Sequence, residues 1–203
     1  MKARLNAGIE STVPADLITQ IRACTLCVDE LPNDPKPIFV FNPSASLNII
    51  GQAPGKLAHD SGIAWNDPSG ERLRTWLGIC SDTFYAATNI LPMSFCFPGY
   101  KNNADAPPLK RCAPTWHRQF LDASTATLTV YIGRYAQQHY LPEYKNLTDA
   151  VADWQTLLPS QRIVLPHPSG RNNRWLTKHL WFERDVLPKL RKCTTDAIKQ
   201  HYC

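Results

Sequence analysis

One turn in this chain has the residue types expected of a ligand-binding loop. The segment Gly51–Gly55, with the sequence GQAPG, directly follows the apolar run Leu47–Ile50. Glycine permits positive φ angles and close approach of a ligand to the backbone, and proline stiffens a turn. In open α/β folds, ligands bind outside the carboxyl ends of parallel strands. The pattern predicts a buried strand ending in a binding turn, although an ordinary strand-to-helix loop shares it.

A second polar group surrounds His167, which stands between two prolines and precedes the basic loop Ser169–Arg174. Flanking prolines restrict the backbone of the histidine, and arginine side chains are suited to phosphate contacts. Because the short apolar run Arg162–Leu165 comes just before, we expect this loop at the same sheet edge as the Gly51–Gly55 turn. A solvated surface loop is the alternative.

Four of the seven cysteines have a spacing that suits metal ligation. Cys24 and Cys27 form a Cys-x2-Cys pair, which lets two thiolates bind one metal ion or cluster. Cys96 and Cys112 bracket a long loop, and such loops are usually functional or held in place. A site shared by both pairs explains both positions, although zinc and redox sites use the same short spacing. The remaining cysteines are expected to be core, surface or terminal thiols: Cys80, Cys193 and Cys203.

The elements that must position these groups alternate between strands and helices. Segments 47–50, 84–91, 125–132 and 162–165 have the apolar or β-branched composition of strands. No hairpin signature is present, so the alternation predicts an α/β fold: a single domain with a central, mainly parallel four-stranded sheet flanked by helices. The expected helices occupy segments 14–27, 69–79, 114–121, 133–140, 151–157 and 181–192.

Length and composition indicate one well-packed domain, since the 203 residues are 43% hydrophobic. We assign residues 14–192 to this domain and expect poor order in residues 1–13 and a tail over residues 193–203. The net charge of +5 is compatible with a polyanionic partner. No apolar run approaches the roughly 18 residues of a membrane span, and no signal peptide is evident. We therefore expect a cytoplasmic monomer with no membrane association.

Two of these motifs together resemble a known family. The Gly51–Gly55 turn and the later segment His167-Pro168-Ser169 resemble, in sequence and order, the two active-site motifs of the uracil-DNA glycosylase superfamily. The resemblance extends from about Cys24 to Leu190 and is closest to the iron–sulfur (family 4) branch, in which one cysteine pair precedes the first motif and another flanks a loop. It implies a three-layer fold and a 4Fe–4S cluster, with zinc or no metal as alternatives. The implied ligands are Cys24, Cys27, Cys96 and Cys112.

The resemblance implies a monofunctional DNA N-glycosylase that excises uracil and starts base excision repair. Such an enzyme flips a nucleotide out of the duplex and hydrolyses its N-glycosidic bond, leaving charge on the base. His167 and the backbone amide of Gln52 would donate hydrogen bonds to that base. Trp65 would stack on it, and the side-chain amide of Asn89 would recognise its edge. Gly51 and Ala53 would line the base, while Ser169, Gly170, Arg171 and Arg174 would contact DNA.

The first motif departs from the family pattern at two positions. Ala53 stands where some members have Asp or Asn to orient or activate water, and Gln52 stands where the iron–sulfur branch often has Glu. A carboxylate elsewhere must then act on the water. We assign this role to Asp60, which is nearer the turn than Asp67; a helix cap or a solvated loop residue is the alternative for both.

Other functions are also compatible with the sequence. Loss of the side chain at Ala53 would suit a weak or inactive member of the superfamily that binds damaged DNA. The four cysteines alone would suit a metal protein that does not act on DNA. Within the glycosylase interpretation, hypoxanthine and xanthine are alternatives to uracil, and the sequence does not distinguish single-stranded from double-stranded substrates.

Overall fold

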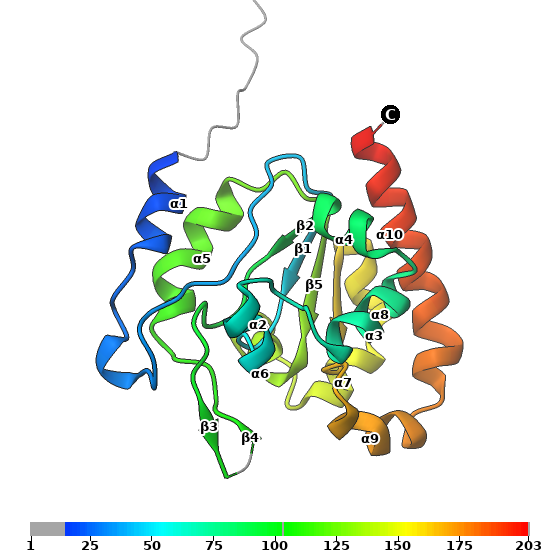
Figure 1. Ribbon diagram of the computed structural model, residues 1–203. Coiled ribbons are helices and arrows are strands. Elements are labelled where there is room, and N and C mark those ends of the chain that lie inside the picture. Colours follow the sequence, from blue (N-terminus) through cyan, green and yellow to red (C-terminus); the bar gives the residue numbers. More distant parts are fainter. Residues whose placement is uncertain (1–14, 103, 203) are drawn as a thin grey trace, which may run out of the picture.

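The centre of the molecule is a parallel sheet of four strands (Figure 1). The computed structural model describes residues 15–102 and 104–202, and within them the strand order of this sheet is β2-β1-β5-β6. Each neighbouring pair is parallel. The predicted α/β class with a four-stranded sheet is therefore confirmed. The strands are β1 (Leu47–Ile50), β2 (Thr88–Ile90), β5 (Leu128–Ile132) and β6 (Arg162–Leu165).

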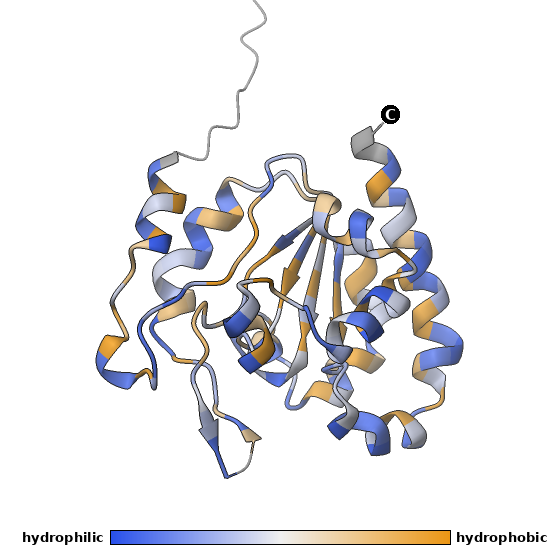
Figure 2. Cartoon of the chain, viewed as in Figure 1, coloured by the Kyte–Doolittle hydropathy of each residue, from blue (hydrophilic) through white to orange (hydrophobic). Residues whose placement is uncertain are grey.

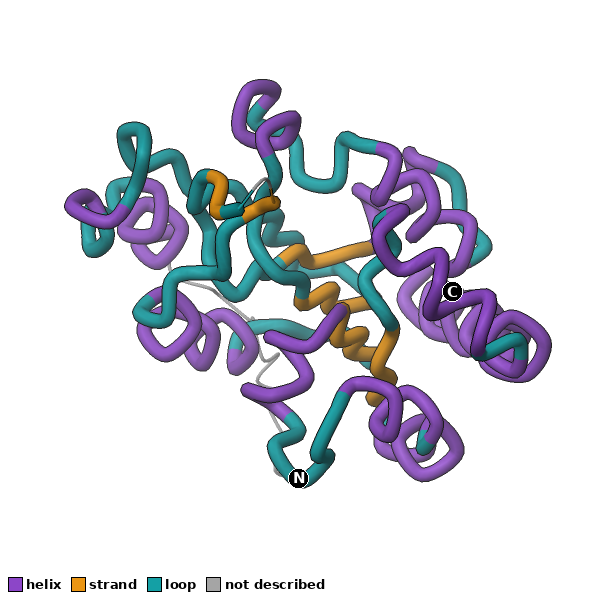
Figure 3. Tube along the Cα trace, turned by 90° about the horizontal axis from the view of Figure 1, so that it is seen from below, coloured by secondary structure: helices purple, strands orange, loops and turns teal. Residues whose placement is uncertain are grey.

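The strands are almost wholly buried because helices lie on both sides of the sheet (Figure 3). All of β1 is buried, and its Ile49 pairs in register with Ile90 of β2 and Val130 of β5. Strands covered on both faces have continuous apolar sequences rather than alternating ones. Figure 2 shows the corresponding concentration of hydrophobic residues in the strands, with hydrophilic residues on the outward sides of the helices.

Helices connect the parallel strands. α3 begins where the Asp67 carboxylate accepts a hydrogen bond from the Gly70 amide at 2.7 Å, and it ends at Gly78, whose φ is 73°. In the part of the chain that the structure describes, no helix is both long and apolar enough to cross a membrane. The α-helices are α1 (Ala15–Arg22), α2 (Lys56–Ser61), α3 (Pro68–Leu77), α4 (Ser81–Ala87), α5 (Cys112–Asp122), α6 (Gly133–Tyr140), α7 (Leu147–Ala152), α8 (Trp154–Leu157), α9 (Asn173–Lys178) and α10 (Leu187–Tyr202).

Helix α4 occupies part of a segment that was expected to be a strand. Residues 84–91 alternate in polarity, but Phe84-Tyr85 belongs to α4 and the strand begins only at Thr88. The Phe84 amide donates to the Cys80 carbonyl at 2.9 Å, and Thr88 Oγ1 donates to the Phe84 carbonyl at 2.7 Å. Since α4 has only two turns and β2 three residues, neither is long enough for its periodicity to be distinguished.

The loop over residues 94–114 contains a small hairpin that the sequence pattern did not predict. β3 (Tyr100–Lys101) pairs antiparallel with β4 (Ala104–Asp105), and the hairpin projects from the lower edge of the molecule in Figure 1. Asn102, at the hairpin end of β3, has a φ of 51°, a left-handed conformation that asparagine tolerates better than most residues. Strands of two residues carry no periodicity, so only the turn residues could have indicated them.

Helix α10 extends through most of the segment expected to be a tail. It continues beyond Lys192 to Tyr202. Leu190, Thr194 and Ala197 are buried and lie on one helix face, so the apolar spacing that holds α10 against the domain persists past residue 192. Residues 1–13, at the other end, lie outside the described residues.

Candidate active site

A cavity of about 420 Å³ lies at the carboxyl edge of the sheet. The Gly51–Gly55 turn after β1 and the segment after β6 both line it, as the parallel topology predicts. The Met93 and Ser94 amides donate to the carbonyls of Gly51 and Gln52, at 2.9 and 3.2 Å, and hold the turn in place. The volume is in the range of small-molecule sites. Beyond the turn, the polar and aromatic lining includes Trp65, Asp67, Asp105, His167, Ser169 and Arg171.

His167 presents a hydrogen-bond donor to this cavity in its neutral form. Its Nδ1 accepts a hydrogen bond from the Ser169 amide at 3.3 Å, which assigns the proton of a neutral imidazole to Nε2. Burial lowers the pKa of His167, while the charges of Asp67 and Asp105 oppose that shift. The Asn172 side-chain amide donates to the His167 carbonyl at 2.7 Å and fixes the backbone. The ring is therefore neutral and oriented at neutral pH.

The Trp65 indole lies beside the imidazole of His167. The two rings are stacked, with centroids 5.7 Å apart and an interplanar angle of 30°. A Cβ atom on Gly51 would lie 2.9 Å from Cζ2 of the indole, so glycine is needed there for the ring to pack on the turn. The Trp65 ring thus contacts both motifs at once.

The backbone of Trp65 is held in an unfavourable conformation. Its φ is 58°, which is uncommon for a bulky residue and persists only where the surroundings impose it. The Trp65 carbonyl accepts from Arg74 Nη1 at 3.2 Å, and a Cβ on Gly70 would lie 1.8 Å from that oxygen. Next to it, the Tyr85 hydroxyl donates to the Ala64 carbonyl at 2.8 Å. Helices α3 and α4 therefore fix the position of the indole.

The structure separates the two carboxylates considered from the sequence. Asp60 lies on the exposed surface of α2, where Lys56 Nζ donates to it at 2.6 Å and lowers its pKa. Among the described residues that line the cavity, Asp60 is absent. Its position therefore differs from the one expected of a residue that acts on the hydrolytic water. Asp67 does line the cavity, and it also caps α3. A third carboxylate, Asp105 of the unpredicted hairpin, lies at the cavity as well.

A comparison with protein families agrees with this geometry. Residues 38–191 match the family model described as the uracil DNA glycosylase superfamily, and this match covers more than half of the chain. The chain belongs to this superfamily. Members of the uracil DNA glycosylase superfamily generally hydrolyse N-glycosidic bonds in DNA, and both cavity-lining motifs lie inside the matched region.

Asn89, which was expected to recognise the base in this superfamily member, has a different position. It is buried and lies outside the cavity lining of the described residues. Its Oδ1 accepts from the Asn42 amide at 2.8 Å, and its Nδ2 donates to Asn48 Oδ1 and Ser124 Oγ, both at 3.0 Å. Because Asn48 is its register partner on β1, the Asn89 side chain serves to join strands and loops. These surroundings differ from those expected of a residue that recognises the base.

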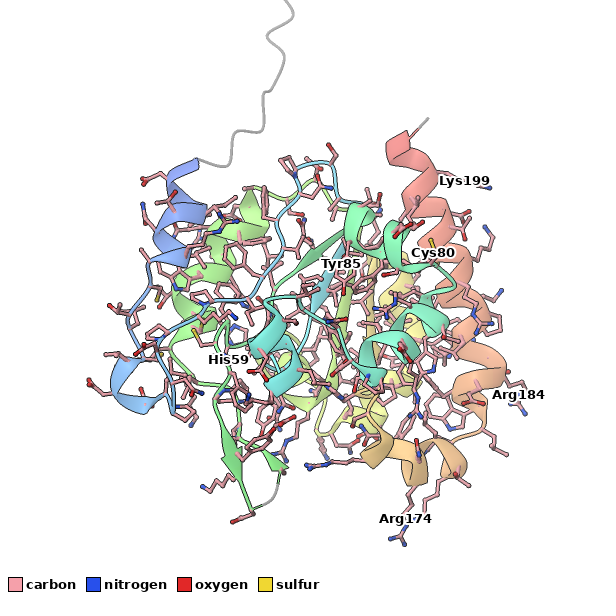
Figure 4. The ribbon with its side chains drawn as sticks, in the orientation of Figure 1. His59, Cys80, Tyr85, Arg174, Arg184 and Lys199 are labelled. Carbon is pink, nitrogen blue, oxygen red and sulfur yellow. The ribbon has the colours of Figure 1, made fainter. Side chains whose placement is uncertain are left out.

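The residues expected to contact DNA are divided between the cavity and the surface. Ser169 and Arg171 line the cavity, whereas Gly170 is exposed at the start of the same turn. Arg174 points away from the body of the molecule (Figure 4). Arg72 Nη1 bonds Asn173 Oδ1 at 2.8 Å and ties this segment to α3.

Sequence reasoning missed two further residues of the lining. Arg134 and Tyr135 follow β5 at the same sheet edge, and Arg134 Nη2 donates to the Tyr135 hydroxyl at 2.8 Å. The rule that parallel strands share a carboxyl edge would have found them, since they come directly after a predicted strand.

The four cysteines expected to bind metal line a second, smaller cavity. Its volume is about 20 Å³, and Cys24, Cys27, Cys96 and Cys112 all contribute to it. Burial raises the pKa of Cys96 to about 11 and that of Cys112 to about 12; a backbone hydrogen bond opposes each shift, and the neighbouring cysteines add to it. Among the described residues, no group of three or more His, Cys, Asp or Glu side chains has the arrangement of a metal-ion site.

One further group in this small cavity lacks a partner. Trp116 lines the cavity, and its indole N–H is buried without a hydrogen-bond partner among the described residues.

Unlike the four cysteines of the small cavity, Cys80 is exposed and lies near α10 on the other side of the molecule (Figure 4). The thiol pairs that were grouped by spacing are thus grouped in space, and Cys80 is apart from them.

Proposed function

We propose that this protein excises uracil from DNA by hydrolysing the N-glycosidic bond, the first step of base excision repair. The observation that carries the proposal is the pairing of a neutral, oriented His167 with the fixed indole of Trp65 above the Gly51–Gly55 turn. A flat heterocycle with carbonyl oxygens matches a stacking surface with a donor at its side.

The proposed reaction begins with extrusion of the nucleotide into the cavity. The base stacks on Trp65, and the Nε2–H of His167 donates to its O2 oxygen. As the bond from C1′ to N1 breaks, its electron pair moves into the base, and the hydrogen bond strengthens because negative charge gathers on O2. The backbone amide of Gln52 would add a second donor. A neutral imidazole with its proton on Nε2 suits this role, because it can donate this hydrogen bond without first changing its protonation state.

The sugar that remains is an oxocarbenium-like cation. Asp67 lines the cavity and its charge acts on His167, and we assign its carboxylate the role of stabilising that cation electrostatically. Its Oδ1 already caps α3, which fixes the carboxylate and removes the need for reorganisation during the reaction.

For DNA, we propose that the segment after the second motif enters or flanks the gap left by the extruded base. Arg171 is placed at the cavity, and Arg174 faces solvent beside it, where a phosphate contact costs little desolvation. Ser169 and Gly170 begin this turn, in which the Asn172 backbone amide donates to the Ser169 carbonyl at 3.0 Å. We expect the protein to act as a cytoplasmic monomer.

We further propose that the chain belongs to the iron–sulfur branch and binds a 4Fe–4S cluster through Cys24, Cys27, Cys96 and Cys112. Two observations support the proposal: all four cysteines line one cavity, and the unpartnered Trp116 N–H there can donate to sulfur. A cluster bound there would cross-link the segment after α1 to the start of α5. Base excision transfers no electrons, so this role is structural. A brown protein that absorbs visible light after anaerobic purification would support the presence of the cluster. A colourless protein with bound zinc would contradict it.

An oligonucleotide assay tests the function. Single- and double-stranded oligonucleotides with one uracil, hypoxanthine or xanthine are incubated with the protein, and abasic sites are cleaved with alkali. We expect cleavage at uracil and release of the free base. Cleavage only at hypoxanthine or xanthine would show that the substrate is a deaminated purine rather than uracil. DNA binding without cleavage would indicate an inactive, damage-binding member, and neither binding nor cleavage would indicate a metal protein with another target.

A further inference from the structure

A carboxylate from outside both motifs lies at the mouth of the active-site cavity. Asp105 ends β4 of the hairpin and lines the cavity together with His167. Its charge acts on His167, and its Oδ2 would lie 4.0 Å from a Cβ placed on Gly55. Asp105 is therefore next to the first motif, although its sequence position is far from that motif.

Asp105 differs from the other two candidate carboxylates in having no competing partner. Asp60 is paired with Lys56 on the surface, and Asp67 caps a helix. Within residues 15–102 and 104–202, Asp105 makes no ion pair, and its side chain is exposed at the cavity mouth. A hydrated carboxylate at the entrance of a cavity can both hold a water molecule and accept a proton.

Backbone contacts fix the base of the hairpin that carries Asp105. The Ala106 amide donates to the Gly99 carbonyl at 2.8 Å, directly below the pairing of Tyr100 with Asp105. Gly99 has a φ of 83°, and a Cβ on it would lie 2.9 Å from Cγ of Pro32, so the chain packs closely there. In the sequence, the hairpin lies between Cys96 and Cys112, and both of these cysteines line the small cavity.

From these observations we infer that Asp105 is the residue that orients and deprotonates the hydrolytic water. This inference rests on the proposed glycosylase function. Asp105 would supply the polar group that Ala53 lacks. The loop between Cys96 and Cys112 would then carry the general base and have a role in the chemistry.

The step is balanced as follows. After the bond from C1′ to N1 breaks, its electron pair stays on the base, whose O2 is hydrogen bonded to His167. The oxygen of the water forms a bond to C1′ and completes the abasic sugar. One proton of the water passes to the Asp105 carboxylate, and from there it returns to solvent or to the departing base. No oxidant, reductant or further reactant takes part.

The test uses the full-length protein with the deaminated base that the wild type excises. Single-turnover excision is measured for Asp105→Asn and Asp105→Glu, together with affinity for an oligonucleotide bearing a non-cleavable 2′-fluoro nucleotide. Asp122→Asn, an exposed residue of α5 that faces only Arg118 in the ion pairs described, is the matched control. We expect Asp105→Asn to lose roughly 100-fold or more in rate, the scale of a lost general base, while binding and thermal unfolding stay unchanged.

The variants separate the outcomes. Partial recovery of the rate in Asp105→Glu, with a wild-type rate in Asp122→Asn, supports the inference. A wild-type rate in Asp105→Asn overturns it and leaves the glycosylase proposal intact. A slow Asp105→Asn whose unfolding temperature or analogue affinity falls in proportion also overturns it, because the hairpin would then act only in folding or binding. A wild type that excises no base overturns the proposed function itself.

Discussion

The two cavities described above differ in what lines them. The larger, of about 420 Å³, is lined by charged, polar and aromatic groups and lies at the ends of the strands. The smaller, of about 20 Å³, is lined by four thiols among prolines, leucines and aromatic rings. Polar groups in a cavity of this size can bind and react, whereas thiols that gather from separate segments, of which Cys112 is buried and the other three are partly buried, can connect those segments. Under the proposed function, the first cavity would perform the chemistry and the second would support it.

One buried histidine connects the two cavities. His117 lies on α5, the helix that begins at Cys112, and its Nε2 donates to the carbonyl of Pro92 at 2.9 Å. Pro92 lines the larger cavity. The Nδ1 atom of His117 accepts from the Tyr140 hydroxyl at 2.6 Å, since the carbonyl fixes the proton on Nε2. Through this residue, the position of α5 is transmitted to the wall of the active site.

The largest effect is expected when the smaller cavity is disrupted. Cys112→Ser should abolish visible cluster absorbance and lower the free energy of unfolding by several kcal/mol, because the binding energy of a structural metal centre is folding energy. Absorption spectra and urea unfolding measure both. Cys80→Ser, which changes an exposed thiol outside the cavity, should leave them as in the wild type. Equal effects of the two substitutions would contradict the special role of the cavity.

Disruption of the larger cavity should affect rate rather than folding. His167→Gln is expected to lower single-turnover excision roughly 10²–10³-fold, the cost of one oxyanion donor, with an unchanged unfolding midpoint. The matched control is His139→Gln, at an exposed position of α6. If His167→Gln instead unfolded the protein and left the rate of the folded fraction unchanged, the assignment of chemistry to this cavity would fail.

The connection through His117 should appear in the pH dependence of stability. Burial lowers the pKa of His117 to about 4, below the value of 6.5 for an unperturbed histidine. Between these pH values the unfolded chain binds a proton that the folded chain does not. The free energy of unfolding should therefore fall by about 3 kcal/mol as the pH drops from 6.5 to 4.

Urea unfolding at several pH values measures this dependence. His117→Gln should be less stable at pH 7 and should show a flatter curve, because the titrating group is gone. An unchanged slope in that variant would show that other groups cause the acid sensitivity, and the coupling between the cavities would lose its support.

The smallest effect concerns the rim of the larger cavity. Arg174→Ala should weaken DNA binding uniformly across sequences and reduce the slope of log affinity against log salt by about one, as expected for one phosphate contact. Fluorescence anisotropy over a range of salt concentrations measures the slope. Arg118→Ala, at an exposed position of α5, is the control. If the two variants had the same DNA affinity and the same salt dependence, the DNA-binding surface would have to lie away from the second motif.

Residues that are close in sequence to a strand end were predictable. The Gly51–Gly55 turn and His167 meet at one cavity because a parallel topology brings strand ends to one edge, and the four cysteines lie together as their spacing indicated. The short strand Arg162–Leu165 was also located correctly. Such predictions depend on local sequence and a general rule of topology.

Residues whose roles depend on long-range packing were not predictable. Asn89 follows the expected pattern of a recognition residue, yet Asn42, Asn48 and Ser124 surround it in space. Asp105 was overlooked because two-residue strands leave no periodic signal. The helical position of Phe84 depends on a two-turn helix, for which the sequence pattern is ambiguous.

The left-handed backbone of Trp65 has a consequence for kinetics. Since Gly70, Arg74 and Tyr85 fix the backbone that carries the indole, the surface proposed to receive the base is complete before DNA arrives. No lid or loop closure is then needed to order it, and the entropy of ordering does not oppose binding. The slow conformational step should belong to the DNA, so single-stranded or mismatched substrates, whose bases unstack most easily, would be processed fastest.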